Sequence, residues 1–275
     1  MKRSRIEPSS TVRATCLWLS LACLAGAGCN LDGEWFTEQS REVATDDIRA
    51  VFSATASGDG RTVVEARLIT DLGSLFFDDV ILVDHDRLFV KRIDPIDASE
   101  REKLLDRKRG PRYRESFGGE EKDTGFEIRF DRPETGHRNA PDSRASLPTP
   151  FTLRWVDDPI ANTPAPEPFS RSSATPYYVV WDPFDSPDFE PGDVLTYMVS
   201  GPCIQSRDGT LDWEAGEDVL QLTGFLMDLP PPDDGRSCPI RVRIVLERAG
   251  SIDPEFSRGS FFGRQVRELR IQSEP

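Results

Sequence analysis

The stretch IRAVFSATASGDGRTVVEARL, residues 48–68, decides the fold class. Apolar and polar positions alternate in both of its halves, and Ser57-Gly58-Asp59-Gly60 separates the halves with residues that favour a turn. A period of two is the repeat of a β-strand that buries one face. The stretch therefore predicts a hairpin whose core-facing residues are Ile48, Ala50, Phe52, Ala54, Val64, Ala66 and Leu68.

Similar alternation recurs from this hairpin toward the C-terminus. Leu75–Val83 and Arg87–Ile93 are expected to pair around Asp84-His85-Asp86, and Phe126, Ile128 and Phe130 share one face. Further strands are expected around Phe151-Trp155, Tyr177-Trp181, Leu195-Val199, Ile240-Leu246 and Leu269-Ile271. Because no long helical patterns intervene, the sequence predicts an all-β protein built from antiparallel β-sandwiches.

Proline-rich stretches suggest where domains begin and end. Residues 132–150 contain five prolines or glycines without sustained periodicity and read as a linker, whereas 159–176 read as a loop inside the second domain. We therefore expect two β domains, as usual for this length. Their expected bounds are 47–147 for the N-terminal domain and 148–275 for the C-terminal domain.

One helix is expected in the first domain, near residues 97–108. Ser99 and Glu102 have the spacing of a capping box, and Gly110-Pro111 supplies a stop. Leu104 and Leu105 are its only apolar residues. The pattern therefore predicts a charged helical insertion on the surface.

The N-terminus has the three parts of an export signal. Lys2, Arg3, Arg5 and Arg13 precede an uncharged run, Ala14–Gly28, which ends in small residues. The run is shorter than the roughly 20 apolar residues that a membrane span requires. Residues 1–28 are therefore predicted to be a removable signal, which places the mature protein outside the cytoplasm.

Leu24-Ala25-Gly26-Ala27-Gly28-Cys29 resembles the lipobox of bacterial lipoproteins, although Gly26 stands where that pattern usually has leucine. The resemblance implies that Cys29 receives the lipid and that residues 29–46 form a tether to the membrane. Asn30 favours the outer membrane over the inner one. Ordinary cleavage after Ala27 is the alternative.

Two cysteines remain beyond the anchor. Cys203 and Cys238 form an even pair in an exported chain, where disulfides are stable. A zinc site is the other interpretation of paired cysteines, but two thiolates do not complete a zinc shell and no histidine lies in this half of the chain. We therefore predict a Cys203–Cys238 disulfide.

The segment YYVVWDPFDSPDFEPGDVLTYMVSG, residues 177–201, resembles the B and C strands of a fibronectin type III or immunoglobulin-like module through Trp181, Pro183 and Tyr197. That resemblance implies an immunoglobulin-like sandwich for residues 148–275. The whole pattern of signal, β domains and one disulfide resembles lipoproteins of Gram-negative bacteria, a group that supplies no catalytic residues to transfer.

Charge narrows the range of partners. The full chain has a net charge of −14, and removal of residues 1–28 makes it −17. Nucleic acids and anionic lipid surfaces are recognised by basic patches, so this balance argues against both. An acidic chain can instead attract divalent cations or basic partners.

Two groups of residues are candidate cation sites. The first is an acidic run that could offer calcium its preferred oxygen ligands, although Pro183, Pro187 and Pro191 also suit a rigid polar connection. Its members are Asp182, Asp185, Asp188, Glu190 and Asp193. The second is His85 between Asp84 and Asp86, where an ordinary polar turn is the favoured interpretation.

The sequence shows no catalytic motif, so we expect a protein that is not an enzyme. The expected function is a non-enzymatic envelope component that presents sandwich loops to a protein or a glycan. The alternative is a calcium-dependent or carbohydrate-active protein, the latter acting through paired carboxylates.

Overall fold

The computed structural model describes residues 37–70, 78–95, 100–108, 110–171, 175–182, 189–212, 219–222 and 237–274. These residues belong to one compact unit, Trp35–Pro275. The predicted signal peptide, Cys29 and the tether up to residue 36 lie outside the described residues.

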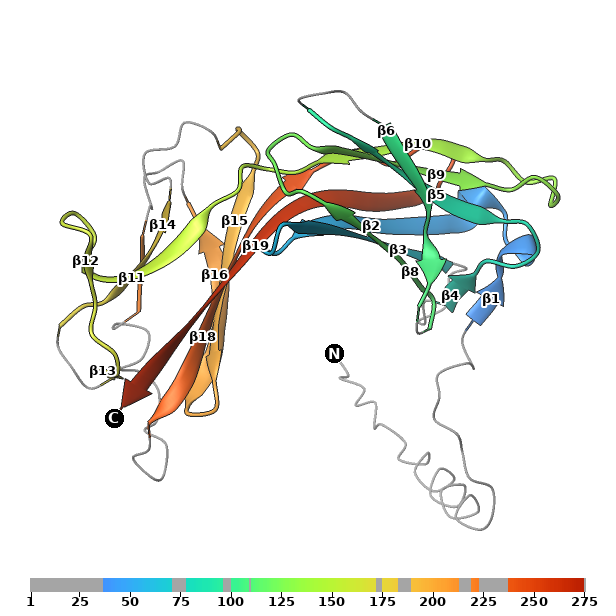
Figure 1. Ribbon diagram of the computed structural model, residues 1–275. Coiled ribbons are helices and arrows are strands. Elements are labelled where there is room, and N and C mark those ends of the chain that lie inside the picture. Colours follow the sequence, from blue (N-terminus) through green and yellow to red (C-terminus); the bar gives the residue numbers. More distant parts are fainter. Residues whose placement is uncertain are drawn as a thin grey trace, which may run out of the picture. The chain divides into compact units, whose positions relative to one another are not determined.

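One large sheet runs through both halves of this unit (Figure 1). Its central strands are β3 (Arg61–Thr70), β2 (Ile48–Ala56), β19 (Arg258–Glu274), β18 (Cys238–Ala249), β15 (Val194–Gly201) and β16 (Ile204–Leu211), in that order. β1 (Thr37–Gln39), β4 (Asp78–Ile81), β7 (Asp106–Arg107), β8 (Arg112–Gly118) and β13 (Phe169–Ser170) join it at its margins. Most pairs are antiparallel, but β19 runs parallel to β2 and β13, and β1 runs parallel to β4.

Two four-stranded sheets complete the fold. The first has the order β10 (Ala140–Ser146), β9 (Gly125–Asp131), β5 (Arg87–Ile93) and β6 (Glu100–Leu104). The second has the order β12 (Thr163–Pro164), β11 (Thr152–Asp158), β14 (Tyr178–Asp182) and β17 (Val219–Gln221). The predicted all-β class with antiparallel sheets and sandwich packing is confirmed.

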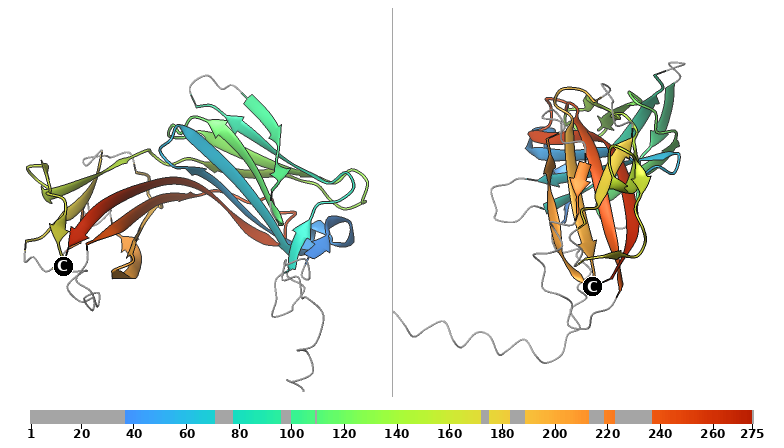
Figure 2. Two further views of the ribbon diagram at one scale, coloured as in Figure 1. Left: turned by 60° about the horizontal axis from the view of Figure 1, so that its bottom comes forward. Right: turned by 90° about the vertical axis from the view of Figure 1, so that its left-hand side faces the viewer.

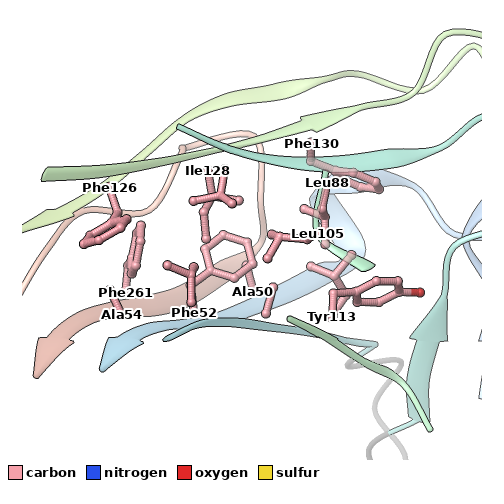
Figure 3. Packing of buried hydrophobic residues seen from close by; sticks show 14 of the residues in the cluster. Ala50, Phe52, Ala54, Leu88, Leu105, Tyr113, Phe126, Ile128, Phe130 and Phe261 are labelled. Atoms are coloured by element: carbon pink, nitrogen blue, oxygen red, sulfur yellow. The ribbon is translucent and has the colours of Figure 1, made fainter. Parts of the chain in front are cut away.

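The first core lies between β10-β9-β5-β6 and the large sheet. Alternate residues of β2 are buried, as the opening hairpin predicted, and Phe52 packs edge-on against Phe261 of β19 at 5.7 Å between ring centroids. Figure 3 shows Phe126, Ile128 and Phe130 on the core side of the smaller sheet, with Phe126 beside Phe261. Burial of such aromatic side chains supplies most of the favourable free energy of this core.

The second core lies between the other small sheet and β15, β16, β18 and β19. Trp155, Phe169 and Tyr177 form an aromatic group with ring centroids 5.0–5.6 Å apart. Ile240, Ile244 and other alternate residues of β18 face them. The predicted disulfide between Cys203 and Cys238 is present at the margin of this core.

The two cores are not carried by two separate segments of chain. Leu147 ends the first core and Phe151 begins the second, close to the expected boundary, but Phe256 and Phe261 return to the first core from the C-terminal region. β19 pairs with β2 over residues 258–265 and with β18 over residues 262–273. Figure 2 shows this long strand crossing both halves. Residues 148–275 therefore complete the first core as well as building the second.

The expected helix near residues 97–108 is wrong. Residues 100–104 form β6, which pairs with β5 from Ile93↔Glu100 to Phe89↔Leu104, and residues 106–107 form β7. An isolated helix with two apolar residues buries too little surface to be stable, whereas the extended backbone gains a ladder and buries Leu105.

One strand pairing and two segment boundaries also differ from expectation. β4 and β5 do not pair with each other, because β4 joins the large sheet and β5 joins the small one. Residues 140–146 of the expected linker form β10, whose small residues and bulge conceal its period. The end of the expected tether forms β1 and two 3₁₀ turns, Ser40–Glu42 and Thr45–Asp47. Within the described residues, no helix has the length and apolar character needed to cross a bilayer.

Candidate surface for an acidic partner

The large sheet buries one face and exposes the other. Residues that stand opposite each other in a ladder point to the same face, so the register identifies every outward position. Phe52 pairs with Phe261, and both are buried, which makes the neighbouring positions of β2 and β19 outward. Among the described residues, neither small sheet contributes to this outer face, since both pack on the opposite one.

The outer face is rich in arginine, and we call it the arginine face. Its arginines are Arg49, Arg61, Arg67, Arg112, Arg114, Arg241, Arg243, Arg258, Arg264 and Arg270. Its carboxylates are Glu65, Asp79, Asp106, Asp208, Glu247, Glu268 and Glu274. The face therefore has an excess of positive charge, although the chain as a whole has a net charge of −14.

Three hollows open on the arginine face. A hollow of about 530 Å³ lies over β15, β16, β18 and β19, and its charged lining residues are Arg243, Arg264, Glu247 and Asp208. A second, of about 270 Å³, lies between Arg241, Arg243 and Met198, and a third, of about 200 Å³, lies beside Arg241 and Arg270. The arginines of β18 thus border all three hollows.

The charge excess is sharpest around Glu268. Arg241 and Arg270 both form ion pairs with Glu268. Their Nε atoms lie 3.2 Å and 3.0 Å, respectively, from the same carboxylate oxygen, Oε1. Arg243 stands directly opposite Glu268 in the ladder, but its side chain forms no ion pair or hydrogen bond with any described residue. We call Arg241, Arg243 and Arg270 the arginine cluster, because Glu268, which pairs with two of them and stands opposite the third, is the one carboxylate among them in the ladder.

Apolar side chains accompany the cluster. Met198 is opposite Arg243 on β15 and is 37% exposed, which is high for a methionine. Val266 lines the same hollow as Met198. Arg264 is held by Glu247 at 2.6 Å and lies over the ring of Phe262. The face therefore combines cationic groups with apolar ones.

The described members of the acidic run have arginine partners. Arg248 donates from Nε and Nη2 to the two oxygens of buried Asp193, at 2.8 Å and 2.9 Å, and also approaches Glu190. These hydrogen bonds to Asp193 raise the pKa of Arg248. Asp182 pairs with Arg154 at 2.9 Å. Asp185 and Asp188 lie outside the described residues, and among those described no three carboxylate, histidine or cysteine side chains gather as a metal site.

The histidine turn directs its acidic residues apart. Asp84 and His85 form the turn, and His85 Nδ1 lies 2.7 Å from exposed Glu134. Asp86 points inward to Arg132, with 3.2 Å between Oδ2 and Nε, while Asp84 faces Arg41. This arrangement corresponds to the favoured interpretation, a polar turn.

The disulfide has a polar neighbour that sequence reasoning missed. Arg171 is buried, and its Nη1 lies 3.4 Å from Cys203 Sγ and 2.7 Å from Ser273 Oγ. Its backbone N–H also donates to Glu274 O at 2.8 Å. Arg171 therefore links the end of β13 to the end of β19.

Part of the arginine face is readable from the sequence. The outward alternation of Arg241, Arg243 and Glu247 along β18 could be read from the sequence, and the structure places them so. The sequence does not reveal that arginines of β2, β3 and β8 lie on the same face. These strands reach it through the parallel pairing of β2 with β19, which joins segments about 200 residues apart. A signal was available only in the arginines at alternate strand positions, such as Arg112 and Arg114.

Comparisons with known proteins leave the family open. No family model and no curated protein matches the chain. Solved structures with similarity include an Escherichia coli alpha-2-macroglobulin activated by porcine elastase, with 12% identity and a TM-score of 0.23. The Yersinia pseudotuberculosis adhesin InvE has 10% identity and a TM-score of 0.22. Each match covers 83% of this chain, but 20% of the macroglobulin and 59% of the adhesin, so the chain spans less than two thirds of either.

Proposed function

We propose that the protein is a non-enzymatic binding protein of the bacterial envelope, anchored through Cys29, which docks an acidic partner on the arginine face. The proposal rests on one observation, the concentration of arginine on the exposed face of the large sheet in a strongly acidic chain. Arginine side chains form paired hydrogen bonds with carboxylates, which gives such a surface directional as well as electrostatic selectivity. The location rests on the export signal and the lipobox resemblance of residues 24–29.

The rest of the molecule would position this face. Burial of the opposite face in two cores makes the large sheet a rigid support, and rigid supports lower the entropy lost on binding. The long β18 and β19 ladder joins the arginines of one half to those of the other. An acidic surface could therefore contact the face over an extended area.

Binding of poly-L-glutamate tests this proposal. A soluble form that lacks the signal and carries Cys29→Ser should bind the polymer at about 0.05 M salt and lose it toward about 0.5 M, since salt screens exposed charges. The variant R112Q/R114Q/R241Q/R243Q should lose binding while keeping its melting temperature, because these side chains are exposed. Wild-type binding by this variant, or no binding by the parent, would refute the docking surface.

The anchor has its own measurement. Mass spectrometry of the mature N-terminus should find a lipid-modified Cys29 as the first residue. A peptide that begins at Gly28 with an unmodified Cys29 would instead favour ordinary cleavage after Ala27.

A further inference from the structure

The arginine cluster has more positive charge than its surroundings neutralise. One carboxylate, Glu268, receives both Arg241 and Arg270, and its side chain is 35% exposed. Arg243 has an exposed guanidinium without a partner among the described residues. A carboxylate of a ligand could therefore pair with Arg243, whose side chain has no partner among the described residues, and with Arg241 or Arg270, which share Glu268.

The spacing of the cluster matches that of an extended polypeptide. Arg241 and Arg243 lie two residues apart on β18, so their Cα atoms are roughly 6.7 Å apart. Glutamate side chains at alternate positions of an extended segment repeat at the same distance. Because facing β-layers lie about 10 Å apart, arginines of one layer and glutamates of the other reach each other.

The hollows indicate what else the ligand carries. Met198 and Val266 line the hollow of about 270 Å³ together with Arg241 and Arg243. An apolar side chain beside the carboxylates would fill this space and remove Met198 from water, which is favourable. A polypeptide supplies acidic and apolar side chains on one face, whereas an acidic polysaccharide has no apolar side chain to place there.

We propose that the arginine cluster binds an extended acidic polypeptide segment, with two carboxylates at alternate positions on Arg241 and Arg243 and an apolar side chain against Met198. This inference rests on the proposed docking function and assigns it a site and a ligand class. The rest of the arginine face adds long-range attraction, and the cluster adds selectivity for the alternating pattern.

The test uses the soluble Cys29→Ser form and the peptide acetyl-Glu-Thr-Glu-Thr-Leu-Thr-Glu-Thr-amide. Its isomer, acetyl-Glu-Thr-Thr-Glu-Leu-Thr-Glu-Thr-amide, has the same composition and charge, but no two of its glutamates lie two residues apart. Polygalacturonate serves as an acidic polysaccharide. Calorimetric titration at low salt should give tighter binding of the alternating peptide than of either competitor.

Two double variants locate the site. R241E/R243E should weaken binding of the alternating peptide by about tenfold or more, since it replaces two attractions by repulsion. R112E/R114E makes the same charge change on β8, at a distant position of the arginine face, and should stay within about twofold of wild type. R241Q/R243Q removes the charges without adding carboxylates and supplies the same comparison if the charge reversal fails to fold.

The outcomes separate this inference from the proposed function. Equal binding of the two isomers, tighter binding of polygalacturonate, or a loss in R112E/R114E rather than R241E/R243E would overturn the cluster and leave the face as the docking surface. Absence of binding by both peptides and by poly-L-glutamate would overturn the docking function itself. A Met198→Asp variant should also weaken binding of the alternating peptide, because it places a negative charge in the hollow, where it repels the carboxylates of the peptide.

Discussion

Arg132 carries a guanidinium into the interior of the first half, where its side chain has no exposed area. It contacts Asp86 at 3.2 Å, and it donates to Val43 O at 2.8 Å and to Thr45 Oγ1 at 3.0 Å. A further contact, to Ser40 O, binds the same N-terminal segment. Desolvation lowers the pKa of Arg132, while the charge of Asp86 opposes that change.

Replacement of Arg132 should therefore be costly. Arg132→Met leaves Asp86 charged and buried, and loss of one partner of such a pair costs about 3–5 kcal/mol of unfolding free energy. Urea unfolding at neutral pH measures the loss. The double variant R132M/D86N should lose less, because no unpaired charge remains, and Arg270→Met should change stability by less than about 1 kcal/mol, as exposed pairs do. Equal losses for Arg132→Met and Arg270→Met would contradict the buried pair.

Calcium is expected to leave the melting temperature unchanged within about 1 °C, since a ligand that does not bind the folded state cannot stabilise it. The reason lies at Asp193, whose two oxygens are held by Arg248. A calcium ion there would displace Arg248 and leave its charge without the partner that raises its pKa. Thermal unfolding with calcium and with chelator checks this, and magnesium is the control. A calcium-specific rise would restore the acidic run as a site.

Individual strands were predictable where side chains alternate cleanly. β2, β3, β9 and β18 follow the period of two, because each buries one face only. β6 was not predictable from the sequence, because Ser99 and Glu102 have the spacing of a helix N-terminus. The strand is stabilised instead by pairing with β5, which the local pattern does not reveal. β10 was missed because a bulge between Ala140 and Ser143 breaks its period.

Strand pairing was less accessible than strand existence. The sequence placed a turn at Asp84 to Asp86 correctly but could not show that β4 and β5 part into different sheets. Polar residues suit a turn that joins two paired strands, and they equally suit a turn that connects strands of different sheets. Local chemistry therefore determined the turn, and long-range packing determined the pairing.

The distribution of charge is a property of the whole molecule that composition conceals. A net charge of −14 argued against basic patches, yet the ladders from β8 to β18 align arginines on one face. Summed charge describes the field far from the protein, whereas a partner at contact distance meets the local arrangement within a Debye length of about 8–10 Å. The arginine face forms only because strands distant in sequence lie side by side in the large sheet.

The continuity of β18 and β19 predicts that the two cores unfold together. We expect one thermal transition, with the same midpoint by two probes. In a form that lacks the signal and carries Trp35→Phe and Trp213→Phe, fluorescence reports on Trp155 and Trp181 in the second core, and hydrogen exchange of β5 and β9 reports on the first. Phe261→Ala should destabilise the protein by about 3–5 kcal/mol, as large cavities do, and should lower both midpoints equally although Phe261 belongs to the first core.

A surface substitution provides the comparison for this experiment. Val194→Ala changes a side chain that is 43% exposed and should shift neither midpoint appreciably. If Phe261→Ala lowered the hydrogen-exchange midpoint and left tryptophan fluorescence unchanged, the cores would be independent. Such a result would mean that the β18–β19 ladder joins the halves in space without coupling their stability, and it would remove the rigid support that the arginine face is proposed to use.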